Sequence, residues 1–247
     1  MTAMPLGPLA AEQNHFSGVR SVARSHVGLV RIINEDRVFD CPERCLWAVA
    51  DGMGGHAGGD VAAQMVVDRL RALTASDRAI RFTDMLVALG QANGDIRQRN
   101  DYLRTGAGAT VVAAMIEGST THIAWAGDSR AYRLRDGGLD LLTHDHSLVQ
   151  ELVDAGLLAA DRAESHPQSH VVTRALGVDD DPRVQTVSVR LKPSDRLLLC
   201  SDGLSRSLEA ADATSDAIET LAERMLANAL ARDGSDNVSL VILEWWS

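Results

Sequence analysis

Four short apolar segments of this sequence each lie beside an aspartate and a glycine, and this pattern constrains the fold more than any other feature. The segments are Leu46–Ala50, Ile123–Ala126, Leu197–Ser201 and Val238–Leu243, and the aspartates are Asp51, Asp128, Asp202 and Asp236. Apolar runs of this length, bounded by turn residues, are typical of buried β-strands. The pattern therefore predicts core strands that carry carboxylates at their ends.

The rest of the sequence predicts β-hairpins and a few helices. Glu117-Gly118-Ser119 and Asp136-Gly137-Gly138 separate pairs of strand-like segments, as hairpin turns do. The further predicted strands are Phe16–Arg24, Arg37–Phe39, Ala109–Ile116, Ala131–Arg135, Leu139–Leu142 and Val184–Leu191. The predicted helices are one beginning near Gly59, one from Phe82 to Ile96, Leu148–Ala155 and Ser215–Ala231. Hairpin-linked strands with segregated helices predict an α+β fold with largely antiparallel sheets.

The domain organisation is expected to be simple. No repeat or Pro/Ser-rich linker interrupts the 247 residues, so we expect a flexible tail over residues 1–15 and one domain over residues 16–247. The first fifteen residues lack Lys and Arg and have an interrupted apolar pattern, which is unlike a signal peptide. With three cysteines and no long apolar segment, the chain is expected to be a cytoplasmic monomer without a disulfide framework.

The net charge limits the partners of the chain. The formal charge is −10, whereas nucleic acids and anionic membranes are bound through excess positive charge. We therefore expect neither as a partner. A metal-dependent nuclease would share an acidic site, but the sequence has no basic stripe to bind its substrate.

The aspartates at the strand ends have two interpretations. A single Asp-Gly is ordinarily just a turn, but four such carboxylates would repel one another if the strand ends converged. Burying a carboxylate is costly unless it is solvated, paired or bound to a cation. Oxygen donors without Cys or His favour Mg²⁺ or Mn²⁺ over zinc. Chance turns and a binuclear site for phosphoester chemistry both remain open at this point.

A nucleotide site is a weaker alternative. Gly52–Ala57 matches the G-x-G-x-x-A pattern of dinucleotide-binding loops. However, Asp51 directly precedes the turn, where a pyrophosphate needs positive potential, and the following chain is rich in hairpins rather than βαβ units. We therefore do not expect nucleotide binding.

Six short motifs occur in an order that is specific to one family. They are Arg31-Ile32-Ile33-Asn34-Glu35-Asp36, Asp51-Gly52-Met53-Gly54-Gly55-His56, Gly108-Ala109-Thr110-Val111, Gly127-Asp128-Ser129-Arg130, Ser201-Asp202-Gly203-Leu204 and Gly234-Ser235-Asp236-Asn237. From about Ser17 to Glu244 the chain resembles the PPM family, the metal-dependent type 2C serine/threonine protein phosphatases, in their bacterial form. The resemblance implies a four-layer α-β-β-α sandwich of two antiparallel sheets flanked by helices.

The resemblance also implies roles for single residues at a site for two Mn²⁺ or Mg²⁺ ions. Asp51 resembles the carboxylate that bridges both ions, and the Gly52 carbonyl resembles a ligand of one of them. Asp202 and Asp236 resemble ligands of the other ion. Arg31 resembles the arginine that holds the substrate phosphate.

The remaining site residues implied by the resemblance lie around this pair of ions. Glu35 and Asp36 resemble members of an outer shell that acts through water. Asp128, together with Asp202, resembles the pair that takes a weaker third ion in bacterial members. The polar segment from Asp154 to His170 matches the flap beside that ion.

The implied activity is hydrolysis of phosphoserine and phosphothreonine by direct attack of a metal-bridging hydroxide. The implied partners are phosphorylated proteins and a cognate serine/threonine kinase. Residues 23–51 especially resemble phosphatases of bacterial type VI secretion clusters. The alternative is a non-catalytic relative that binds phosphoproteins as a signalling scaffold.

One position departs from the pattern of many eukaryotic members. Met53 follows the Asp-Gly pair where those members have a histidine that is a proposed general acid. His56 is close in sequence, but nothing in the sequence brings it to the leaving group, so we assign no general acid. For His144 and His146 we expect loop or capping roles, and for Arg174 a structural ion pair.

Overall fold

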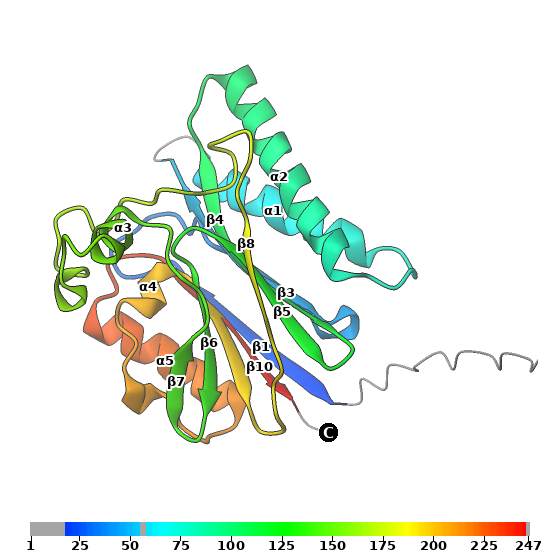
Figure 1. Cartoon of the computed structure of the whole chain (residues 1–247), viewed down its shortest axis with the longest axis vertical. Coiled ribbons are helices and arrows are strands. Elements are labelled where there is room, and N and C mark those ends of the chain that lie inside the picture. Colours follow the sequence, from blue (N-terminus) through cyan, green and yellow to red (C-terminus); the bar gives the residue numbers. More distant parts are fainter. Residues whose placement is uncertain (1–17, 55–57, 246–247) are drawn as a thin grey trace, which may run out of the picture.

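The computed structural model of the chain describes residues 18–54 and 58–245 as two five-stranded sheets between two layers of helices (Figure 1). This arrangement confirms the expected α+β fold with four layers. The tail expected over residues 1–15, and His56, lie outside the described residues. The strands are β1 Val19–His26, β2 Arg37–Cys41, β3 Leu46–Met53, β4 Gly108–Glu117, β5 Thr120–Ala126, β6 Arg130–Arg135, β7 Gly138–Leu141, β8 Gln185–Val189, β9 Arg196–Cys200 and β10 Val238–Trp245. The α-helices are α1 Gly59–Thr74, α2 Phe82–Leu103, α3 Leu148–Asp154, α4 Asp202–Ser205 and α5 Ile218–Arg232.

All neighbouring strands pair antiparallel. One sheet has the order β2-β3-β4-β5-β8 and the other the order β1-β10-β9-β6-β7. The first and last strands pair along their whole length, from Val19 opposite Trp245 to His26 opposite Val238. Segments from both ends of the described chain therefore lie side by side.

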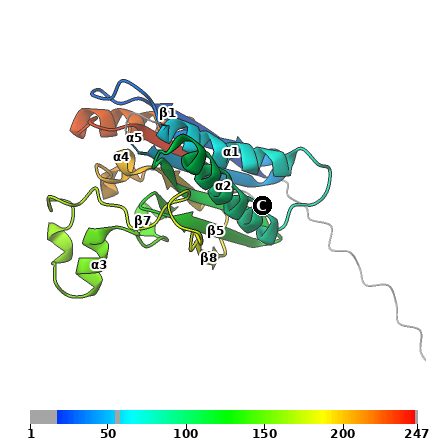
Figure 2. The ribbon, with the colours of Figure 1, turned by 90° about the horizontal axis from the view of Figure 1, so that it is seen from above.

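Three apolar cores separate the four layers. One lies between α1, α2 and the β2–β8 sheet, a second lies between α5 and the other sheet, and a third lies between the two sheets. Strand β3 contributes to two of them, because successive side chains point to opposite faces. Its Leu46 and Ala48 lie in the core beneath the helices, whereas Trp47 and Val49 lie in the core between the sheets. Figure 2 shows α1 and α2 over one side of the molecule.

The structure differs from the sequence-based expectations at several boundaries: for example, α2 continues past Ile96 to Leu103, and β1 continues past Arg24 to His26. Strand β3 continues past Ala50 to Met53, because Asp51, Gly52 and Met53 still pair with β4. Helix α5 begins at Ile218 rather than Ser215. Just before it, the Thr214 carbonyl accepts a hydrogen bond from Arg196 at 3.0 Å, which holds this segment outside the helix.

The short helix α3 begins as expected but with half of the expected capping box. The Gln150 backbone N–H donates to Ser147 Oγ at 3.3 Å. The Gln150 side chain donates to Asp154 at 2.9 Å instead of returning to Ser147. No helix in the described part of the chain is both long and apolar enough to cross a membrane.

Candidate active site

The antiparallel pairing brings the aspartates to one edge of the two sheets. Asp51 lies near the end of β3, and Asp128 lies in the turn between β5 and β6. Asp202 follows β9, whereas Asp236 precedes β10, and these two ends meet because β9 and β10 run antiparallel. The convergence that the sequence left open is thus a consequence of the strand order.

An open cleft of about 650 Å³ lies at this edge. Residues from the β1–β2 segment, β3, β4, the flap, α4 and the turn before β10 line it. Those predicted from the sequence are Arg31, Glu35, Asp51, Gly52, Asp128, Asp202 and Asp236; Met53, Thr110, His170, Val172 and Arg206 also line it. Asp36 is not among the lining residues and lies buried behind them, with 2% of its surface exposed.

The carboxylates at the cleft repel one another. Burial, and then the charges of Asp36, Asp202, Asp128 and Asp236, raise the pKa of Asp51 well above its usual value. Burial raises the pKa of Asp128 to about 7, with a further contribution from the charge of Asp202. The pKa of Asp202 is raised as well, mainly by burial. Without a cation, this edge of the fold therefore favours protonated carboxyl groups.

Asp36 has one satisfied and one unsatisfied oxygen. Its Oδ2 accepts a hydrogen bond from Ser201 Oγ at 2.8 Å, and Ser201 Oγ accepts one from the Ser239 N–H at 3.0 Å. Its Oδ1 is buried and has no hydrogen-bond partner among the described residues. Burial raises the pKa of this carboxyl to about 7. A buried polar atom without a partner indicates a position for water or an ion.

Two arginines supply positive charge at the cleft. Arg31 Nη2 lies 2.9 Å from Asp236 Oδ2, and the Arg31 side chain is half exposed. Arg206 Nη2 lies 2.6 Å from Asp202 Oδ2, one helical turn away in sequence. The hydrogen bond and charge of Asp236 raise the pKa of Arg31. Both contacts show that these carboxylates attract a cation.

The β1–β2 segment, which carries Arg31 and Glu35, is held against the turn before β10 mainly by Asn237. The Asn237 side chain donates to the carbonyls of Val27 and Ile33 at 2.8 and 3.0 Å and accepts from the Glu35 N–H at 2.8 Å. The backbones also approach closely: a Cβ at Gly28 would lie 2.1 Å from the Asp236 carbonyl oxygen. Glycine is therefore required where the two segments meet.

Glu35 lies beside the first turn of α1. Burial, then the charge of Asp60, raises the pKa of Glu35 despite the opposing charge of Arg31. A Cβ at Gly59 would approach Glu35 Oε1 to 2.6 Å. The helix start and this carboxylate thus fit together only because residue 59 lacks a side chain.

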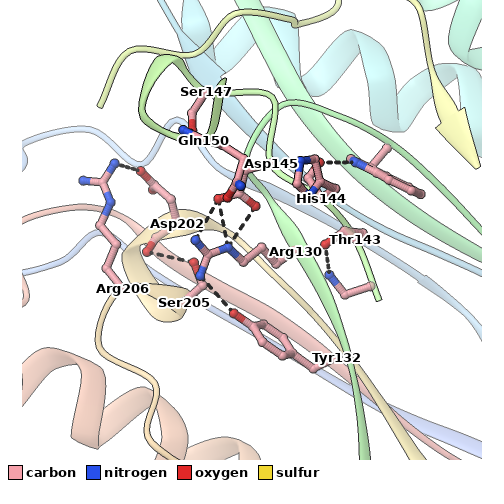
Figure 3. Close-up of polar contacts among 12 residues, drawn as sticks. Arg130, Tyr132, Thr143, His144, Asp145, Ser147, Gln150, Asp202, Ser205 and Arg206 are labelled. Atoms are coloured by element: carbon pink, nitrogen blue, oxygen red, sulfur yellow. Dashed lines mark hydrogen bonds and ion pairs between the residues drawn. The ribbon is translucent and has the colours of Figure 1, made fainter. Parts of the chain in front are cut away.

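A second, smaller cavity of about 50 Å³ lies under the flap and shares Asp128, Asp202 and Arg206 with the cleft. Figure 3 shows the polar residues around it. Arg130 donates to both oxygens of Asp145 at distances from 2.7 to 3.1 Å. Arg130 also donates to the Tyr132 hydroxyl at 3.1 Å. These contacts hold the wall of the cavity beside Asp128.

The donor set fits Mg²⁺ or Mn²⁺. In residues 18–54 and 58–245, no three His, Cys, Asp or Glu side chains are arranged so that together they could hold a metal ion. Mg²⁺, however, is usually held by one or two carboxylates with waters in the remaining positions. The mutual repulsion of the aspartates, the unsatisfied Asp36 oxygen and the all-oxygen donors agree with such hydrated ions.

The histidines and Arg174 have structural contacts. His146 is buried; its Nδ1 accepts from the Gly127 N–H at 3.1 Å, and its ring stacks on Trp125. His144 Nε2 lies 2.7 Å from Asp154 Oδ2. Arg174 lies 3.4 Å from His146 Nε2, so it contacts a histidine rather than the expected carboxylate.

Sequence analysis missed three residues that shape the site: Ser201, Arg206 and Asn237. The first and last lie within the quoted motifs, so their position was visible although their hydrogen bonds were not. The i,i+4 spacing of Asp202, at the start of α4, and Arg206, directly after its last residue, is the signal that predicts their ion pair.

The comparisons with known proteins agree with this arrangement. The sequence profile described as protein phosphatase 2C matches residues 24–237. The chain belongs to the protein phosphatase 2C family. It is 38% identical over 247 residues to the serine/threonine protein phosphatase PstP of Mycobacterium tuberculosis, covering 92% of this chain and 45% of that protein. The chain thus spans slightly less than half the length of that curated relative.

Other members of the protein phosphatase 2C family match over nearly their full length. The serine/threonine phosphatase stp of Listeria monocytogenes is 36% identical over 241 residues, covering 90% of this chain and 94% of that protein. The solved catalytic domain of PstP, in complex with two manganese ions, has a TM-score of 0.84 and 33% identity over 93% of this chain and 99% of that one. PppA of Pseudomonas aeruginosa is described as a key regulatory component of T6SS. Its structure has a TM-score of 0.84 and 35% identity, and the match covers 94% of this chain and 99% of that one.

Proposed function

We propose that this chain is a metal-dependent protein serine/threonine phosphatase that hydrolyses phosphoserine and phosphothreonine in proteins. The observation that carries the proposal is the cleft lined by Asp51, Asp128, Asp202 and Asp236, beside which Arg31 presents a half-exposed guanidinium. Membership of the protein phosphatase 2C family supports the same activity.

In this proposal two Mn²⁺ or Mg²⁺ ions are held by Asp51, the Gly52 carbonyl, Asp202 and Asp236. When bound, such ions supply an activated water and neutralise the charge of a phosphoryl group. Glu35 and Asp36 orient waters around the ions, and the unsatisfied Asp36 oxygen supports this role. Asp128, with Asp202, is the proposed site of a weaker third ion.

Arg31 is the proposed phosphate-binding residue. A guanidinium can donate two parallel N–H groups to phosphate oxygens, and its planar shape orients the group. Arg31 contacts Asp236 in this structure, so it must exchange this partner for the phosphate. Met53 lines the cleft but carries no proton to donate, so we assign no side chain as general acid.

Hydrolysis of p-nitrophenyl phosphate and of a phosphothreonine peptide tests the proposal. The chelator-treated protein should be inactive and should regain activity with Mn²⁺ or Mg²⁺. Asp202→Asn should lose activity by more than the roughly 100-fold that an outer-shell change costs. Asp216→Asn, at an exposed ion pair outside the cleft, is the matched control.

Inactivity with Mn²⁺ across pH 7–9, or full activity of Asp202→Asn, would contradict the assignment. A Mn²⁺ titration by calorimetry separates the scaffold alternative, because binding without turnover of either substrate would favour a non-catalytic phosphoprotein-binding relative.

For the cellular role, we propose that the chain acts as a monomer in the cytoplasm and opposes a serine/threonine kinase. Its similarity to PppA and the motif text of residues 23–51 favour a context in type VI secretion control. A kinase gene beside the gene for this chain, and reversal of that kinase's phosphorylation by the purified protein, would support the pairing. Phosphoproteins that remain unchanged would argue against it.

A further inference from the structure

The segment beside the cleft carries an unusual run of exposed apolar side chains. Leu29, Val30, Ile32 and Ile33 are 68%, 69%, 96% and 62% exposed, and they flank Arg31 on both sides. They are four of the eleven large hydrophobic residues exposed in the described part of the chain. The others are spread over several elements. We call residues 29–33 the apolar strip.

The fold does not need these side chains to hold the segment in place. The strip is anchored through its backbone: the Leu29 N–H donates to the Gly234 carbonyl at 2.7 Å, and Asn237 binds the Ile33 carbonyl at 3.0 Å. The N–H of Glu35, just beyond the strip, donates to Asn237 Oδ1 at 2.8 Å. Backbone and amide contacts therefore position the strip while leaving its apolar side chains in water. Contiguous exposed apolar groups of this kind mark interaction sites.

The strip is continuous with the cleft. Val30 and Arg31 both line it. Because successive Cα atoms are about 3.8 Å apart, every residue of the strip lies within about 8 Å of Arg31 along the chain. A peptide whose phosphate reaches Arg31 can therefore extend its neighbouring residues along the strip. In Figures 1 and 2 the segment joining β1 and β2 lies at the same end of the molecule as the flap.

We propose that the apolar strip selects phosphoprotein substrates with large apolar residues next to the phosphorylated serine or threonine. This inference rests on the proposed phosphatase function. The occupant is the substrate segment beside the phosphate, and Ile32, which is almost fully exposed, makes the largest contribution because it has the most surface to bury. The strip is thus a specificity determinant that takes no part in the chemical step.

The test compares two phosphothreonine peptides of equal charge, one flanked by leucine and valine and one flanked by serine and asparagine. The unaltered protein should prefer the apolar peptide by about tenfold in kcat/KM, the size expected from burying one aliphatic side chain. Ile32→Ser should reduce this preference to about twofold, mainly through KM. Its hydrolysis of p-nitrophenyl phosphate should be unchanged, because that substrate has no flanking residues.

Val87→Ser is the matched control, because Val87 is exposed on α2 and does not line the cleft. This variant should keep the full preference for the apolar peptide. An equal rate for both peptides, or an unchanged preference in Ile32→Ser, would overturn the proposal while normal p-nitrophenyl phosphate hydrolysis left the phosphatase function intact.

Fluorescence anisotropy with both phosphopeptides labelled measures their binding to the protein. It tests the strip proposal even if the protein proves inactive. Tighter binding of the apolar peptide that Ile32→Ser abolishes supports the strip, and equal binding overturns it. Sedimentation equilibrium tests the competing occupant. A dimer that Ile32→Ser converts to monomer would show that a second copy of the chain covers the strip, and would overturn the proposal.

Discussion

Aspartates in two parts of this molecule have opposite surroundings. Away from the cleft, Asp195 accepts hydrogen bonds from Arg135 at 2.7 and 2.5 Å and from the Lys192 N–H at 2.6 Å. Burial alone would raise its pKa, but these contacts outweigh burial and lower it. At the cleft, Asp51 is surrounded mainly by other carboxylates, and its pKa is raised.

Asp212 repeats the first pattern. Arg232, Asn228 and the Glu209 N–H all donate to it, and together they outweigh burial and lower its pKa. This fold can therefore provide an arginine for a buried carboxylate. At the cleft, by contrast, the carboxylates outnumber their arginines, which leaves room for cations from solution.

The largest expected difference between the two regions is in activity. Asp51→Asn removes a proposed metal ligand and should lower kcat/KM for p-nitrophenyl phosphate by more than about 100-fold. Asp195→Asn, an equally conservative change at a paired aspartate, should change it by less than about twofold below the unfolding temperature. Similar losses in both variants would break the comparison.

The second expected difference is in stability without metal. Asp195→Asn should lower the free energy of unfolding by about 2 kcal/mol, because it weakens the hydrogen bonds to Arg135 and the Lys192 N–H. Asp51→Asn should leave the free energy of unfolding unchanged or raise it, since it removes one of several repelling carboxylates. Urea unfolding in the presence of a chelator measures both. A large loss of stability in Asp51→Asn would contradict this account.

The pH dependence of stability should differ in sign between the regions. The pKa values of Asp36 and Asp128 are raised from 3.8 to about 7. Their protonated carboxyl groups therefore stabilise the folded state at acidic pH, and this stabilisation is lost as the pH rises from about 4 to about 7. The pKa values of Asp195 and Asp212 are lowered, so their contribution is present above about pH 4 and is lost as the pH falls below it.

Thermal unfolding at different pH values checks this difference. The chelator-treated protein should melt at a lower temperature at pH 8 than at pH 6, and saturating Mn²⁺ should reduce or reverse the difference. A metal-free protein that gains stability over this interval would show that the cleft carboxylates do not dominate.

The smallest expected effect concerns Arg206, one of the two arginines that line the cleft. Arg206 contacts Asp202 and so competes with a cation, but its side chain is one-third exposed and such a pair contributes about 0.5–1 kcal/mol. Arg206→Ala should therefore tighten Mn²⁺ binding roughly two- to fivefold in a calorimetric titration. Arg224→Ala, whose partner Asp216 lies outside the cleft, should not change it.

Much of the fold follows from local sequence patterns. The apolar runs Leu46–Ala50 and Leu197–Ser201 and the hairpin turns predict the strands, because burial and turn chemistry act over a few residues. The predicted start of α5 was wrong because a tertiary contact decides where the helix begins: Arg196, on the distant strand β9, binds the Thr214 carbonyl. The extension of β3 likewise depends on its pairing with β4.

The arrangement of the site is harder to predict from local sequence patterns than the strands are. Spacing alone left it open whether Asp51 and Asp202 meet, because their approach depends on the order of strands in two sheets. The motif order resolved this only by resemblance. The exposure of Ile32 and Ile33 was not predicted, because apolar residues in sequence normally indicate burial, whereas here the anchoring is done by Asn237.

The pairing of β1 with β10 determines when the cleft can form during synthesis of the chain. Arg31 and Asp236 face each other across a contact that joins the two ends of the described chain, 205 positions apart. While the chain is still on the ribosome, Arg31 emerges 205 residues before its counterpart Asp236. A nascent chain thus cannot assemble the complete cleft before Asp236 and the strand β10 that follows it have been synthesised.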